Sequence, residues 1–118
     1  KLPPNVQERL LRLQQLQQTL QSILAQKQQV DMEKTEVEQT LAELQKTPDD
    51  AVIYKAIGSL LVKAEKPKVN EDLAERKSLL DTRSTIMTRQ EERIRSQVKE
   101  AQTKLQEDLS PVSGQPLS

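Results

Sequence analysis

The side chains that could take part in acid-base chemistry here are carboxylates and lysines, because the sequence contains no histidine and no cysteine. Histidine is the usual general base near neutral pH and a common metal ligand, and cysteine supplies a thiolate nucleophile. Glu91, Glu92 and Glu100 fall on expected helices without a basic or aromatic pocket around them. We therefore assign no acid-base role to any carboxylate and expect a protein that is not an enzyme and needs no cofactor.

One acidic pair lies outside the expected helices and raises the question of a cation site. Asp49 and Asp50 follow Pro48, but two carboxylates without further oxygen ligands at fixed spacing are weak evidence for a bound metal. Aspartate next to proline is typical of turns. We interpret the pair as a turn that leads into a strand, and we expect no metal site.

Composition argues against several further classes of function. The 18 basic and 18 acidic residues balance, and Tyr54 is the one aromatic residue. Nucleic-acid binding usually needs clustered Lys and Arg in excess, or aromatic side chains on which bases stack. The longest uncharged run, Leu13 to Gln26, is rich in glutamine and unsuited to a membrane, and the Pro3-Pro4 start does not resemble a signal peptide. We expect a soluble cytoplasmic protein with no nucleic-acid or membrane partner.

The elements that must position any site are two long helices, and the first is expected over residues 5–46. This range contains neither Gly nor Pro, and apolar residues recur in it every seven positions on two adjacent lines. Such spacing is typical of a coiled coil, and at about 1.5 Å per residue the helix would be roughly 60 Å long. Arg9, Lys27 and Lys34 interrupt the lines. The apolar members are Val6, Leu13, Leu20 and Leu41 on one line, and Leu16, Ile23, Val30, Val37 and Leu44 on the other.

The second helix is expected over residues 67–109, with Pro67 in its first turn, where the missing N–H costs nothing. The two helices have similar lengths, so a reversal of the chain between them would set them side by side and antiparallel. Lys27 and Lys34 would then each face an apolar residue, and we expect their methylene groups to cover it while the ammonium groups reach solvent. The apolar residues that recur every seven positions in this helix are Leu73, Leu80, Met87, Ile94 and Ala101.

The ends of the two helices also carry local signals. Asn5 followed by Glu8 resembles a capping box, with Asn5 as the cap of the first helix. Residues 110–118 include two prolines and a glycine, which is typical of a flexible tail.

Residues 51–64, between the helices, predict a β-hairpin. Gly58-Ser59 separates two apolar runs, which indicates a type II′ turn. Both faces of the hairpin would be largely apolar, and an isolated two-stranded hairpin is marginal in water, so it should need strands from partner subunits. We expect oligomerisation through Val52, Ile53, Tyr54, Ile57, Leu60, Leu61 and Val62.

Three stretches carry a family likeness: Pro-Asp-Asp-Ala-Val-Ile-Tyr-Lys at residues 48–55, the Gly58 that precedes Leu-Leu-Val-Lys at 60–63, and Arg-Gln-Glu-Glu at 89–92. Over residues 3–109 the chain resembles the archaeal prefoldin beta subunit family. The resemblance implies a mainly α fold in one domain over 1–118, with an antiparallel two-helix coiled coil joined by a central β-hairpin that assembles into an intersubunit β-barrel. It also implies a hexamer of two alpha with four beta subunits. Such a hexamer is an ATP-independent holdase that passes unfolded client proteins to a group II chaperonin.

We call the surface along which the two helices contact each other the seam. Where the start of the first helix meets the end of the second, the sequence has more apolar residues than this seam needs. The resemblance implies that clients bind there, whereas the residues alone favour an ordinary seam edge in a structural coiled-coil oligomerisation module without clients. The candidate client-binding residues are Val6, Leu10, Leu11, Leu13, Leu16, Val98, Leu105 and Leu109. Met32, Leu79 and Ile86 lie off the seam, and we expect them to pack on neighbouring helices or to be exposed.

Overall fold

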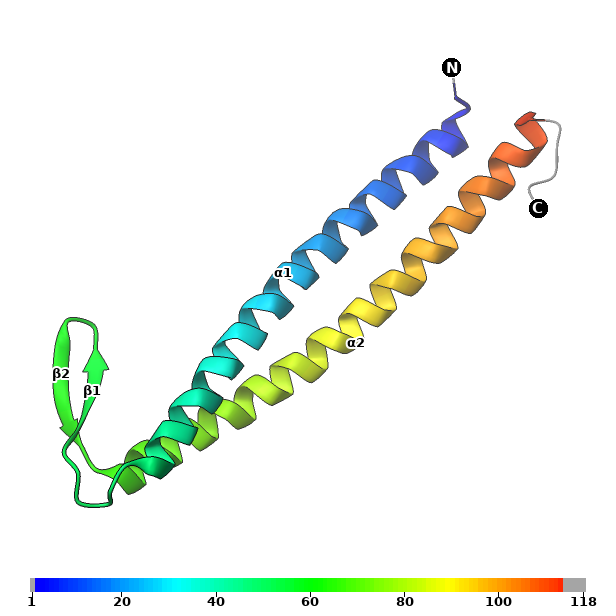
Figure 1. The fold of residues 1–118 in the computed structure, drawn as a ribbon. Helices are drawn as coiled ribbons and strands as arrows, with labels where there is room; N and C mark the ends of the chain where they lie inside the picture. Colours follow the sequence, from blue (N-terminus) through cyan, green and yellow to red (C-terminus); the bar gives the residue numbers. More distant parts are fainter. Residues whose placement is uncertain (1, 114–118) are drawn as a thin grey trace. The chain divides into compact units, whose positions relative to one another are not determined.

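In the computed structural model, the described part of the chain is residues 2–113, with side chains through Ser110. Its elements are α1 (Pro4–Lys46), β1 (Ile53–Ile57), β2 (Leu60–Ala64) and α2 (Lys66–Ser113), in that order along the chain (Figure 1). The predicted mainly α fold, with two long helices and a central β-hairpin, is confirmed.

The helix starts differ from prediction at α1 and agree at α2. The backbone oxygen of Pro3 accepts hydrogen bonds from the N–H groups of Val6 and Gln7 at 3.1 and 3.0 Å, so the helix begins at Pro4 and the predicted Asn5 capping box is wrong. Proline suits this first position because its missing N–H would have no partner there. At α2, Pro67 lies in the first turn as predicted.

The end of α2 lies beyond its expected position. The helix runs to Ser113, so residues 110–113 are helical rather than part of the expected tail. The remainder of the expected tail, 114–118, lies outside the described residues.

The chain forms two compact units, and each contains part of both helices. The first comprises residues 1–27 and 86–118, and the second comprises residues 28–85 with the hairpin. The assignment of 1–118 to one domain stays a prediction. The buried apolar residues of the described chain are Val6 and Leu16 in the first unit, and Val30, Leu44 and Leu80 in the second; Val6 and Leu80 are fully buried.

The hairpin has the register that its turn residues predict. β1 and β2 are antiparallel, with Ile57 opposite Leu60 and Ile53 opposite Ala64. Gly58 has φ +58°, and no non-glycine residue of the described chain has a positive φ, so Ser59 has a negative one. A two-residue hairpin loop is usually a type I′ or a type II′ turn. Type I′ needs a positive φ at both central residues, and type II′ needs it only at the first, so the turn is of the predicted type II′.

Candidate functional site

The hairpin presents a continuous set of exposed apolar side chains, which we call the hairpin patch. Paired residues of the two strands share a face, so Tyr54 and Leu61 lie on one face and Ile57 and Val62 on the other. Contiguous exposed apolar residues mark interaction sites, and here most of both faces is left uncovered by the described part of the chain. Of the predicted oligomerisation residues, Ile53 is half-buried. The other six are 45–72% exposed: Val52, Tyr54, Ile57, Leu60, Leu61 and Val62.

The base of the hairpin is held by Lys66 at the start of α2. Its ammonium group donates a hydrogen bond to the backbone oxygen of Thr47 at 2.8 Å and pairs with the Asp49 carboxylate at 3.0 Å. The N–H of Ala51 donates to the backbone oxygen of Pro48 at 3.1 Å, which closes the predicted turn. No group of three or more potential metal ligands occurs among the described residues. Both aspartates thus lie in a turn, and Asp49 is also in an ion pair.

The seam between the helices contains charges that are paired across it. All three basic residues that interrupt the apolar lines of α1 contact a carboxylate on α2, and these ion pairs were not predicted. The side chains of Lys27 and Lys34 remain partly exposed, which is compatible with the expectation that their ammonium groups reach solvent. These contacts require the antiparallel arrangement of the helices within each unit. The pairs are Arg9 with Asp108, Lys27 with Glu91 at 3.1 Å, and Lys34 with Asp81 at 2.9 Å.

These contacts change the acid-base properties of the seam. The hydrogen bond and positive charge of Lys34 hold the pKa of Asp81 below its usual value, and Asp81 in turn raises the pKa of Lys34. Hydrogen bonds from Arg95 and Lys27 lower the pKa of Glu91. Both carboxylates are therefore charged at neutral pH, as partners of seam cations rather than as candidate acids or bases.

The predicted client-binding residues come together in the first unit, but their exposure differs. Val6 and Leu16 are buried, with 1% and 5% exposed, so they form the core of this unit. Leu11 is 56% exposed. Leu2, which the sequence analysis did not select, is also exposed at this end. The other predicted residues are half-buried: Leu10, Leu13, Val98, Leu105 and Leu109.

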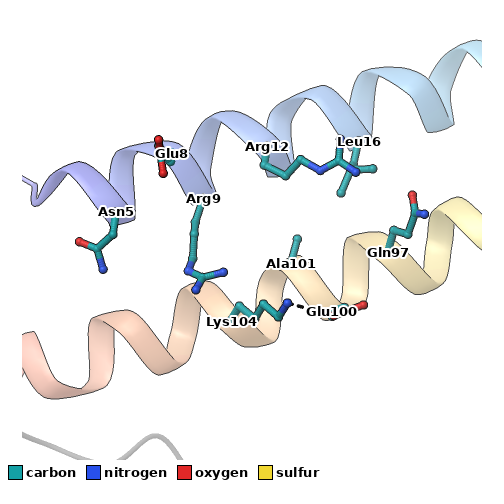
Figure 2. Close-up of a pocket in the computed structure, with 9 residues that line it drawn as sticks. All are labelled: Asn5, Glu8, Arg9, Arg12, Leu16, Gln97, Glu100, Ala101 and Lys104. Carbon is teal, nitrogen blue, oxygen red and sulfur yellow. Dashed lines mark ion pairs between the residues drawn. The ribbon is translucent and has the colours of Figure 1, made fainter.

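A cleft of about 510 Å³ opens between the two helices in the same unit (Figure 2). We call it the tip cleft. It was not predicted, because its existence depends on the separation of the helices, which a heptad pattern does not determine. Its α1 wall consists of Asn5, Glu8, Arg9, Arg12 and Leu16, and its α2 wall of Gln97, Glu100, Ala101 and Lys104.

A comparison of the sequence with models of protein families shows the family to which the chain belongs. The model of the prefoldin subunit family matches residues 7–111. The chain belongs to the prefoldin family. This is a family of non-enzymatic chaperones, so the expectation that the protein is not an enzyme is confirmed. Neither helix of the described chain has a stretch long and apolar enough to cross a membrane.

Several relatives of this prefoldin chain are archaeal beta subunits. Prefoldin subunit beta of Archaeoglobus fulgidus is 45% identical over 113 residues, which cover 96% of this chain and 97% of that protein. Prefoldin subunit beta of Methanothrix thermoacetophila is 44% identical over 108 residues, covering 92% and 90%. The crystal structure of the prefoldin beta subunit from Thermococcus strain KS-1 superposes with a TM-score of 0.85 at 39% identity, covering 92% and 96%. The resemblance found in the sequence is thereby confirmed.

Proposed function

We propose that this chain is a subunit of an ATP-independent holdase that binds non-native polypeptides. The observation that carries the proposal is the match to the prefoldin subunit family over residues 7–111, together with the archaeal beta subunits among its relatives. The hairpin patch supports the assembly part of the proposal, because its six large apolar side chains are 45–72% exposed in the described part of the chain. A subunit that functioned alone would expose this surface to water and to aggregation. The patch therefore supports function within an oligomer.

The proposed oligomer contains two prefoldin alpha subunits and four beta subunits, joined through their hairpins in a β-barrel. Closure into a barrel removes the unpaired edges of β1 and β2 and buries the apolar side chains of the face that points into the barrel. The full burial of a side chain such as Leu61 contributes about 1.5–3 kcal/mol, so several such residues per subunit could outweigh the entropy lost on association.

The proposed client-binding surface is the tip, by which we mean residues 2–16 and 97–110 of the first unit. Leu2 and Leu11 are exposed there, and Leu10, which adjoins Leu11 in the sequence, is half-buried. The half-buried Leu105 and Leu109 belong to the α2 part of the same unit. A few apolar side chains on each of several subunits could hold an irregular client through many weak contacts. Val6 would contribute by keeping the helices paired. Leu16 is buried as well, with 5% exposed, but this small part lines the tip cleft and could contact a client there.

The proposal includes delivery of the held client to a group II chaperonin in the cytoplasm. The competing function is a structural coiled-coil module that oligomerises through the same hairpin and has an inert tip. Both functions use the hairpin patch, so assembly alone does not separate them. Only a measurement of client binding distinguishes the two functions.

The test is an aggregation assay with a slowly refolding client and no nucleotide, using the chain assembled with an archaeal prefoldin alpha subunit. Native mass spectrometry first establishes the stoichiometry, for which we expect two alpha with four beta subunits. A holdase suppresses aggregation at near-stoichiometric ratios. An assembled complex that leaves the aggregation of the client unchanged would favour the structural module and contradict the proposal.

A further inference from the structure

The tip cleft combines an apolar floor with a polar rim. Leu16 from α1 and Ala101 from α2 are its two apolar lining residues, and the other seven carry charged, amide or guanidinium groups (Figure 2). Its volume of about 510 Å³ falls within the range of about 300–1,000 Å³ that is common for ligand sites. A cleft of this volume can hold one or two residues of a peptide. A folded domain would not fit.

The cations of the cleft differ in whether they already have a partner. Arg9 is paired with Asp108, and Lys104 with Glu100 at 3.1 Å. Arg12 has no carboxylate partner in the part of the chain that the structure describes. It lies along α1 next to Leu16 (Figure 2). A ligand carboxylate could therefore reach Arg12 without displacing any internal ion pair.

We propose that the tip cleft binds an extended peptide segment in which one carboxylate-bearing residue adjoins a large apolar residue. The carboxylate pairs with the guanidinium of Arg12, and the apolar side chain packs over Leu16 and Ala101. The amides of Asn5 and Gln97 on the two walls can bond to the peptide backbone. This inference rests on the proposed function, because it specifies the class of client segment that the tip selects.

The chemistry of the rim sets the limits of this selectivity. A guanidinium group can bind a carboxylate through two parallel hydrogen bonds, which an ammonium group cannot do. Glu8 lines the same cleft one helical turn before Arg12, so a second carboxylate in the segment would meet a like charge. The cleft should therefore favour a single acidic residue over an acidic run.

The test uses the chain assembled with an alpha subunit and fluorescent peptides of equal length. One peptide contains Glu-Leu in a neutral polar background, the second contains Gln-Leu, and the third contains three successive Glu residues before Leu. Fluorescence anisotropy should show about two- to fivefold tighter binding of the Glu-Leu peptide than of the Gln-Leu peptide, as expected for an ion pair with the exposed Arg12 guanidinium. The peptide with three Glu residues should bind no tighter than the Glu-Leu peptide.

Three variants locate the effect. Arg12→Gln should remove the preference for Glu-Leu and leave the affinity for Gln-Leu unchanged, and Arg12→Lys should retain part of the preference. Arg83→Gln removes the same charge at an exposed position outside the cleft and should behave like the wild type. Circular dichroism checks that each variant keeps its helix content.

Equal affinities for Glu-Leu and Gln-Leu in the wild type would overturn the proposal, as would equal losses in Arg12→Gln and Arg83→Gln. Aggregation suppression, measured on the same samples, separates this failure from failure of the proposed function. If the cleft has no preference but the tip still holds clients, suppression persists. If neither peptide binds and suppression is absent, both proposals are wrong.

Discussion

At the scale of single residues, the charges in the seam restrict how α1 and α2 can align. A basic side chain at a seam position is favourable only where a carboxylate faces it, because an unpaired charge in a partly buried site is costly. Lys27 meets Glu91, and Lys34 meets Asp81. A shift of one helix by one heptad would separate both pairs. These residues therefore favour a single register, although they weaken the apolar seam.

The lowered pKa values of Asp81 and Glu91 predict a loss of stability in acid. A carboxyl group whose pKa is lower in the folded state stabilises the fold above its unfolded pKa of about 4, and this contribution is lost as the pH falls through the folded value. The double variant Asp81→Asn, Glu91→Gln lacks both groups. Its Tm should be lower than that of the wild type at pH 7 and should fall less between about pH 5 and pH 2.

Thermal unfolding followed by circular dichroism measures both quantities. Glu92→Gln is the matched control, because Glu92 is exposed next to Glu91 and has no ion pair in the described structure. The control should retain the full acid sensitivity of the wild type. If the double variant lost as much Tm on acidification as the wild type, the seam pairs would not be the source of the pH dependence.

The partner of Lys27 could have been inferred from the sequence, since Glu91 occupies a seam line of α2. The sequence analysis identified the lysines as interruptions but expected their ammonium groups to reach solvent. What the pattern could not supply was the rotation of each helix about its axis, which decides whether the charged groups lie close enough to form an ion pair.

At the scale of elements, adjacent leucines on α2 should differ sharply in their contribution to stability. Leu80 is fully buried, whereas Leu79 is 45% exposed. Leu80→Ala should lower the free energy of unfolding by about 2–5 kcal/mol, because it removes buried apolar surface and leaves a cavity. Leu79→Ala should change it by no more than about 0.5 kcal/mol. Urea denaturation of the two variants gives the comparison, and equal losses would contradict the assignment of Leu80 to the seam.

The hairpin should govern assembly with little effect on the helices. Ile57 and Val62 are largely exposed and lie on one face of the sheet. Ile57→Asp with Val62→Asp should release subunits, since burial of the charged side chains in an intersubunit sheet is unfavourable. Helical circular dichroism should remain near the wild-type value. Light scattering reports the mass, and a double variant that still forms the wild-type oligomer would exclude the hairpin as the assembly element.

The elements themselves were largely predictable, and their ends were less so. A heptad repeat sustained through residues 5–46 leaves few alternatives to a long helix, and Gly58 followed by Ser59 determines both the turn type and the strand register. The start of α1 was misassigned because Asn5 and Glu8 have the residue types and spacing of a capping box. The helix in fact begins at Pro4, with the backbone oxygen of Pro3 accepting its first hydrogen bonds. The tip cleft was missed because its width depends on packing between the two helices.

At the scale of the whole molecule, the account assigns assembly and client binding to separate units of the chain. The hairpin patch belongs to residues 28–85, and the tip belongs to the unit formed by residues 1–27 and 86–118. No residue is shared between the two proposed surfaces. The two functions should therefore be separable by mutation.

Binding of clients in general should persist in moderate salt, because the proposed contacts with clients are mainly apolar and the chain has no net charge. An electrostatic holdase would weaken as the Debye length falls toward about 3 Å near 1 M salt. We expect aggregation suppression in about 0.5 M KCl to match that at low salt. By contrast, the Glu-Leu preference of the tip cleft should shrink under the same conditions. Loss of general suppression in high salt would contradict an apolar grip.

The central claim is that the tip holds clients while the hairpin holds subunits together. A variant that lacks residues 1–14 and 104–118 loses Leu2, Leu11, Leu105 and Leu109 but keeps the hairpin and all of the second unit. The Ile57→Asp, Val62→Asp variant is the reciprocal control, with an intact tip and a disrupted hairpin.

Light scattering and aggregation suppression on the same truncated sample provide the most direct test. We predict an oligomer that contains the full number of subunits and has lost most of its ability to suppress aggregation. A single change such as Leu11→Ser should have little effect, because one contact among many is removed. An intact oligomer of the truncated chain that suppresses aggregation as well as the full-length protein would show that clients bind elsewhere.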